Sequence, residues 1–220
     1  MSTTATGAAP DLPPTAWPWL HGVAKWLGTW LFRPFLRVRV HHLDRVPAAG
    51  AVVLVANHSA MVDGPLLFGL IRRRSAFLVK QEMFVGPLGW GLVRIGQIAV
   101  RRGEADRRAL TTALGVLRGG GLVGVFPEGT RGAGDVRAAQ HGAAWLARAS
   151  GAVVVPVVCR GTHRPAGARR RWRPRVDVMV GEPLQIPTGG GRTGLTTGTE
   201  TVRAELARMV RELDHVRSTA

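Results

Sequence analysis

The chain has 220 residues, with 30 Lys and Arg against 14 Asp and Glu, 45% hydrophobic residues and one cysteine. This length fits one compact domain, and the composition is that of a folded rather than a disordered protein. A lone cysteine excludes an intrachain disulfide framework and a cysteine-cluster zinc site. The sequence contains no run of roughly 18 or more apolar residues, so a membrane-spanning helix is not expected. The start does not resemble a signal peptide, and a cytosolic location is therefore expected.

The formal net charge of +16 is the strongest compositional signal. Only Lys25 and Lys80 are lysines, so the other cations are arginines, whose planar guanidinium groups suit phosphate. Nucleic acid, an anionic bilayer and a phosphorylated substrate are all compatible partners. The aromatic residues gather in residues 17–35 rather than in the Arg-rich segment 164–175. This separation disfavours nucleic-acid binding, which predicts basic and aromatic residues on one stripe.

Residues 1–14 are rich in Ala, Thr and Pro and predict a disordered N-terminus. Residues 15–40 contain an amphipathic helix and four of the seven tryptophans. A period of 3.6 residues places an apolar set on one face and a basic set on the other: Leu20, Val23, Leu27, Trp30 and Leu31 against His21, Lys25 and Arg33. Such a helix either lies in a membrane interface or packs on its own domain, and the density of Trp favours the interface.

From residue 41 to 220, strands and helices alternate. Short apolar runs predict strands at 51–56, 77–81, 96–100, 122–126, 152–158 and 176–180. Helices are predicted after Pro65 and over 104–118, 138–149 and 200–217, with loops at 164–175 and 187–199. The alternation predicts an α/β domain with a mostly parallel sheet flanked by helices, preceded by the N-terminal amphipathic helical segment.

The segment after the first of these strands carries His58 and Asp63. A neutral His accepts a proton from a hydroxyl, and a carboxylate on its other ring nitrogen fixes its orientation. On a regular helix two residues five apart diverge by about 140°, so the two side chains meet only if the backbone turns between them. The alternatives are two surface residues, or an Asp63 that only caps the next helix.

Two further segments leave predicted strands with residues suited to phosphate. In residues 126–132, backbone N–H groups and Arg131 can converge on an anion, although a surface turn is the alternative. Residues 96–103 carry Arg101 and Arg102 at the end of a predicted strand. The alternative for this pair is two solvated side chains that bind no ligand.

The combination is more specific than its parts. The blocks N-H-x4-D, G-x-I-x-V-x-R-G, F-P-E-G-T-R and V-P-V, in this order, resemble those of the 1-acylglycerol-3-phosphate acyltransferase family over residues 45–185. The resemblance implies that His58 and Asp63 are the catalytic pair. It also implies a substrate-binding set: Arg102, Glu128, Gly129, Thr130 and Arg131. Two positions depart from the family pattern, because Ala60 stands where members usually carry Ser, and Gln140 where many carry Lys.

The resemblance further implies the reaction. A fatty acyl group would pass from acyl-CoA or acyl carrier protein to the free hydroxyl of a lysophospholipid, above all 1-acylglycerol-3-phosphate, giving phosphatidic acid. His58 would act as general base and Asp63 would orient it, and no metal or other cofactor is expected. The expected location is peripheral, on the cytoplasmic face of an anionic membrane. The alternatives are the same chemistry on another lyso-lipid or an amino-acid lipid, a catalytically silent membrane adaptor, and a basic nucleic-acid-binding protein.

Overall fold

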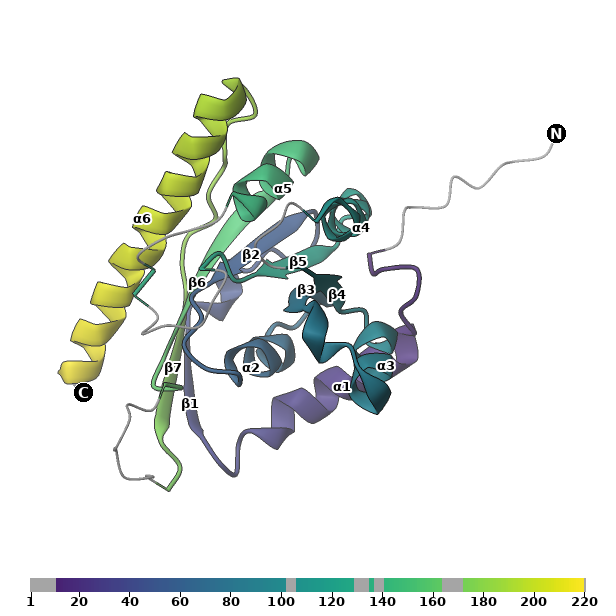
Figure 1. Cartoon of the computed structure of the whole chain (residues 1–220). Helices are drawn as coiled ribbons and strands as arrows, with labels where there is room; N and C mark the ends of the chain where they lie inside the picture. Colours follow the sequence, from purple (N-terminus) through teal and green to yellow (C-terminus); the bar gives the residue numbers. More distant parts are fainter. Residues whose placement is uncertain (1–10, 102–105, 129–134, 137–140, 164–171, 220) are drawn as a thin grey trace.

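The computed structural model describes residues 11–101, 106–128, 135–136, 141–163 and 172–219. Within these residues a seven-stranded sheet has the order β1-β7-β6-β2-β5-β3-β4 (Figure 1). The strands are β1 (Arg37–His41), β2 (Val52–Ala56), β3 (Ser75–Lys80), β4 (Ile98–Val100), β5 (Leu122–Val125), β6 (Val153–Arg160) and β7 (Arg175–Val180). All neighbours pair in parallel except β6 and β7, so the predicted mostly parallel α/β sheet is confirmed.

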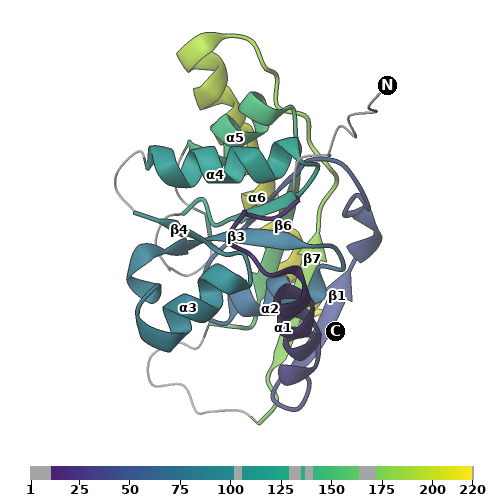
Figure 2. The same cartoon turned by 90° about the vertical axis from the view of Figure 1, so that its right-hand side faces the viewer.

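Helices cover both faces of the sheet. Helices α4 (Arg107–Arg118), α5 (Gly142–Ser150) and α6 (Gly191–Ser218) lie on one face. Helices α1 (Pro18–Leu31), α2 (Asp63–Leu70) and α3 (Gly86–Arg94) lie on the other, as Figures 1 and 2 show from two directions. Two short 3-10 helices, η1 (Leu43–Arg45) and η2 (Gln81–Met83), follow β1 and β3.

The central strand β2 is buried on both sides. Val53 and Val55 enter the core beneath α4, α5 and α6, whereas Val52, Leu54 and Ala56 enter the core on the α1 and α2 side. All five side chains are fully buried, and each Val or Leu contributes about 1.5–3 kcal/mol of transfer free energy. Burial on both faces explains why this strand is a continuous apolar run rather than an alternating one.

Helix α6 begins at Gly191, so the prediction of a loop over residues 187–199 is wrong for most of that segment. Tertiary packing overrides the poor helix propensity of its Gly and Thr residues. Gly198 lies against Ile186, where an added Cβ would come within 2.6 Å of the Ile186 side chain. Thr199 Oγ1 lies 2.9 Å from His141 Nδ1, at the start of α5. Strand β1 and helix α3 are two further elements that the sequence pattern does not predict.

The predicted disordered terminus does not extend to residue 14. Leu12 is buried with 4% of its surface exposed, and Asp11 forms an ion pair with Arg74 at 3.2 Å. Residues 1–10 lie outside the described residues.

Helix α1 is amphipathic as predicted, but its polar face is the one that contacts the protein. His21 is 1% exposed and donates from Nδ1 to the Ile95 carbonyl at 2.7 Å. Lys25 Nζ donates to the carbonyl of Phe68, in the last turn of α2, at 2.7 Å. Burial lowers the pKa of Lys25 to about 8. His21 and Lys25 therefore hold the helix on the domain and do not face outward.

Two glycines allow the polar face of α1 to approach α2 closely. An added Cβ at Gly69 would lie 2.5 Å from the backbone of Gly28, so α2 has no room for a side chain there, and an added Cβ at Gly28 would lie 3.3 Å from the Cα of Gly69. Thr29 Oγ1 donates to the Gly69 carbonyl at 2.9 Å. With this face buried, the apolar face of α1 is left exposed: Trp19 64%, Val23 46%, Trp26 64%, Leu27 51%, Trp30 50% and Leu31 58%.

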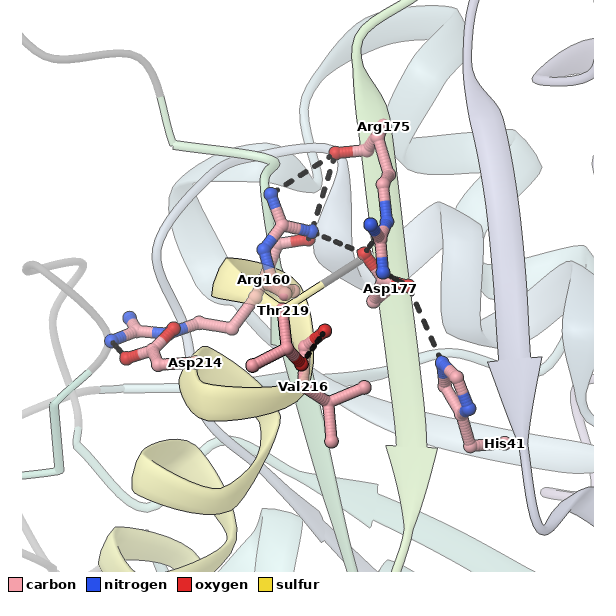
Figure 3. A network of polar contacts seen from close by, with 8 residues as sticks. His41, Arg160, Arg175, Asp177, Asp214, Val216 and Thr219 are labelled. Carbon is pink, nitrogen blue, oxygen red and sulfur yellow. Dashed lines mark hydrogen bonds and ion pairs between the residues drawn. The ribbon is translucent and has the colours of Figure 1, made fainter.

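A buried carboxylate fastens the end of α6 to strand β7 and to the edge strand β1. Asp177 on β7 is fully buried and accepts from Arg175 Nε at 2.8 Å and from the Arg217 guanidinium (Figure 3). His41 Nε2 on β1 lies 3.3 Å from the same carboxylate. Nearby, Arg160 Nε at the end of β6 donates to Asp214 Oδ1 of α6 at 2.8 Å. The network thus joins three strands to the C-terminal helix.

Replacing Asp177 by Asn is expected to lower the free energy of unfolding by about 2 kcal/mol at neutral pH, since hydrogen bonds to a buried charged group are lost. Burial alone would raise the pKa of Asp177, but hydrogen bonds from Arg175 and His41 outweigh it and keep that pKa below its ordinary value. The unfolded chain therefore takes up the proton first, and the stabilisation shrinks as the pH falls below about 4. Urea unfolding of the wild type and of Asp177→Asn, at neutral pH and at about pH 3, measures the difference between their free energies of unfolding. A difference of equal size at both pH values would contradict the prediction.

Candidate active site

The segment between β2 and α2 folds into a tight turn around the carboxylate of Asp63. Asp63 Oδ2 accepts from the backbone N–H groups of Ser59 and Ala60, each at 2.8 Å. The same oxygen lies 3.2 Å from His58 Nδ1. Asp63 is fully buried, and 9% of the surface of His58 is exposed. The backbone turn that the sequence requires for these two side chains to meet is present.

The environment of Asp63 keeps it ionised. Burial raises its pKa, but hydrogen bonds, led by the one from His58, outweigh the burial and leave the pKa below the ordinary value. An ionised carboxylate is only an acceptor, so His58 Nδ1 must carry the hydrogen in the neutral ring. Nε2 is then the ring nitrogen that can accept a proton.

Polar side chains that the sequence analysis missed join this turn to strand β6. Asn57 Nδ2 donates to the Cys159 carbonyl at 3.1 Å, and the Cys159 N–H donates to Asn57 Oδ1 at 2.7 Å. The side chain of Asn57 thereby pairs with the backbone of β6 in the way that one more residue of β2 would. Ser59 Oγ lies 2.9 Å from Thr162 Oγ1, just beyond the end of β6. Two sequence signals mark Asn57, the buried-strand run that ends directly in a polar residue and the first position of the block N-H-x4-D, but neither marks Thr162.

The segment that follows the neighbouring strand β5 contributes a second carboxylate and an aromatic ring. Glu128 Oε1 accepts from the backbone N–H of His58 at 2.9 Å. Burial raises the pKa of Glu128, although the hydrogen bond from His58 opposes this. The Phe126 ring lies 4.4 Å from the His58 imidazole, centroid to centroid, with 30° between their planes. His58 is therefore contacted at its backbone, at Nδ1 and on its ring face.

An apolar cavity of about 290 Å³ extends from His58. Its wall comes from α2, β3, η2, α3 and the segments next to them: Met61, Gly64, Pro65, Phe68, Phe77, Leu78, Val79, Lys80, Met83, Leu88, Leu92, Ile95, Gln97 and Phe126. Gly124 of β5 makes room for one wall, since an added Cβ there would lie 2.3 Å from the Phe77 ring. A His–carboxylate pair at one wall of an apolar cavity suits proton transfer beside a long hydrocarbon chain.

The other predicted site residues fall outside the described part of the chain. Arg102, Gly129, Thr130 and Arg131 are among them, as is Gln140. Of the predicted set, the structure brings together His58, Asp63 and Glu128. Ala60, which departs from the family pattern, contributes its backbone N–H to Asp63.

The comparison with protein families covers the same residues. The sequence model of the Acyltransferase family matches residues 37–160, from the start of β1 to the end of β6. The chain belongs to the Acyltransferase family. This stretch contains the whole His58–Asp63 turn, Glu128 and the strands that carry them. The expected family is confirmed, and the protein is an acyltransferase.

Relatives of known name support a narrower similarity. The acyltransferase is 29% identical over 150 residues to a 1-acyl-sn-glycerol-3-phosphate acyltransferase of Bacillus subtilis, covering 67% of this chain and 73% of that one. A 1-acyl-sn-glycerol-3-phosphate acyltransferase of Chlamydomonas reinhardtii is 33% identical over an alignment of 162 residues, which covers 69% of this chain and 48% of that one. The crystal structure of the 1-acyl-sn-glycerophosphate (LPA) acyltransferase PlsC from Thermotoga maritima matches with a TM-score of 0.66 at 28% identity, over 89% of this chain and 78% of that one.

Nitrogen NMR of the imidazole tests the arrangement of the pair. At a pH where His58 is neutral, its Nδ1 is expected to be protonated and its Nε2 to be a bare acceptor, because Asp63 accepts at Nδ1. The His58→Gln variant, in which this ring is absent, assigns the signal among the seven histidines. A ring protonated at Nε2 would contradict the geometry.

Proposed function

We propose that this acyltransferase moves a fatty acyl group from acyl-CoA or acyl carrier protein to the free hydroxyl of 1-acylglycerol-3-phosphate, giving phosphatidic acid. The observation that carries the proposal is the buried His58–Asp63 pair at the wall of an apolar cavity. The acceptor is proposed from the activities for which the relatives in Bacillus subtilis, Chlamydomonas reinhardtii and Thermotoga maritima are named.

His58 acts as general base in the proposed step. Its Nε2 takes the hydroxyl proton while the hydroxyl oxygen bonds to the thioester carbonyl carbon. The carbon–sulfur bond then breaks, and the imidazolium returns the proton to the departing thiolate, so the products are the ester and a free thiol. General-base catalysis of this kind supplies about 10²–10⁴-fold. Asp63 stabilises the imidazolium, and the thioester is a co-substrate, so no further cofactor enters the step.

The cavity binds the acyl chain of the donor in this proposal. Aromatic and aliphatic side chains such as Phe77, Leu92 and Ile95 form its wall, so a hydrocarbon chain gains about 0.8 kcal/mol for each methylene buried there. His58 lines the same cavity, which keeps the thioester carbonyl next to the base.

The acceptor's phosphate is proposed to bind Arg102, Arg131 and the backbone of Gly129 and Thr130. The support is the resemblance of their blocks to the family pattern and the position of Glu128, which ends the described part of this segment beside His58. A phosphate held there would bring the acceptor hydroxyl to the base.

The exposed apolar face of α1 is proposed to dock on an anionic membrane surface, which places the protein peripherally on the cytoplasmic face. A helix that only packed on its own domain would bury this face, whereas α1 buries His21 and Lys25 instead. Helix α3 extends this surface, since the rings of Trp17, at the start of α1, and Trp90, on α3, meet edge to face with 5.6 Å between their centroids. Among the described helices, none is long and apolar enough to cross a bilayer. Trp and Leu at headgroup depth suit such an interfacial helix.

Replacing His58 by Ala is expected to lower turnover at least about 10²-fold, because the acceptor hydroxyl loses its base. Thiol release from a long-chain acyl-CoA in the presence of lysophosphatidic acid measures it. His215→Ala, on the exposed side of α6, is the matched control and should keep full activity. Near-normal turnover without His58 would refute the assignment of the base.

Replacing Trp19, Trp26 and Trp30 together by Ser is expected to weaken binding to anionic vesicles about 100-fold, at roughly 1 kcal/mol for each lost indole. Trp145→Ser is the matched control, since Trp145 is 37% exposed on α5, across the sheet from α1. Sedimentation with phosphatidylglycerol-containing vesicles compares the proteins. Equal sedimentation of the triple variant and the control would remove α1 from the membrane surface.

A further inference from the structure

We propose that Glu128 is a positioning residue that fixes the backbone of His58 by accepting its N–H, and that this contact sets the turnover of the reaction. This inference rests on the proposed function, because it concerns the same base. It differs from the role implied by the family resemblance, in which Glu128 binds the substrate.

Adjacent strands bring the two residues together. Strands β2 and β5 are parallel neighbours in register, with Val55 opposite Val125, so their carboxyl ends leave the sheet side by side. His58 follows the end of one strand and Glu128 the end of the other. At this point the His58 N–H has passed the last residue of β5 that pairs with β2. Glu128 Oε1 accepts it at 2.9 Å, in place of the missing strand.

The backbone N–H of His58 needs an acceptor because the residue is buried. His58 is 9% exposed, and leaving a buried N–H without an acceptor costs about 1–3 kcal/mol. Without Glu128, the turn would gain by rotating this N–H toward water, and the imidazole would move with it.

Three consecutive N–H groups are held by two carboxylates. The N–H of His58 donates to Glu128, while those of Ser59 and Ala60 donate to Asp63. Asp63 thus fixes the turn from its α2 side and Glu128 fixes it from the β5 side. The position of Nε2 depends on both contacts, and a displacement of about 1 Å at such an atom can cost about 10²-fold in rate.

Two replacements of Glu128 separate a role as hydrogen-bond acceptor from a role as charge, because one keeps the acceptor and the other keeps the charge. Glu128→Gln keeps the side-chain length and a carbonyl oxygen but removes the charge. Glu128→Asp keeps the charge but is shorter by one methylene and does not reach the His58 N–H. A positioning role therefore requires the Gln variant to be the more active of the two, whereas a charge that binds substrate or orders arginines requires the Asp variant to be.

Steady-state kinetics with acyl-CoA and lysophosphatidic acid measures both variants beside wild type and His58→Ala. Glu128→Asp is expected to lose about 10–100-fold in kcat with the acceptor KM nearly unchanged, and Glu128→Gln to recover most of that loss. Glu212→Asp and Glu212→Gln, at an exposed carboxylate of α6, are matched controls, and thermal unfolding verifies that each variant is folded.

An Asp variant as active as the Gln variant or more so, or an effect confined to the acceptor KM, would overturn the positioning role. A wild-type protein that shows no His58-dependent transfer would instead refute the proposed function itself. The two failures are therefore distinct.

Discussion

The carboxylate of Asp63 is the contact on which the site depends. One of its oxygens gathers two backbone N–H groups and the imidazole of His58 within 3.2 Å. These bonds outweigh the cost of burying a charge and keep the group ionised. The same contacts close the turn that precedes helix α2 and orient the ring. The shape of the turn and the ionisation of Asp63 therefore have one physical cause.

The parallel sheet supplies the rest of the site by placing three strand ends at one edge. Asn57 attaches the turn to β6, Glu128 attaches it to β5, and Phe126 covers the imidazole. Beyond the last residues of a strand, the backbone hydrogen bonds between strands end, and polar side chains must pair with the backbone groups instead. Here the replacements are the groups that hold His58. The apolar cavity opens on the same side, between the sheet, α2 and α3.

Features that depend on local sequence pattern were predictable, whereas those that depend on tertiary packing were not. The apolar runs located most strands, and the order of the blocks located His58, Asp63 and the family. Periodicity gave the two faces of α1 but not which face turns inward, since that depends on the glycine crossing at Gly28 and on carbonyls at the end of α2. The start of α6 and the bond from His58 to Glu128 likewise depend on residues far apart in the chain.

The most direct test of the central claim is whether acyl transfer goes straight to the acceptor. Enzyme at a concentration comparable with acyl-CoA is mixed with it, with and without lysophosphatidic acid, and thiol, phosphatidic acid and the intact protein mass are monitored. The account predicts thiol released only with the acceptor, in equal amount to phosphatidic acid, and no acylated protein. A burst of thiol without acceptor, together with a protein mass increased by one acyl group, would contradict it.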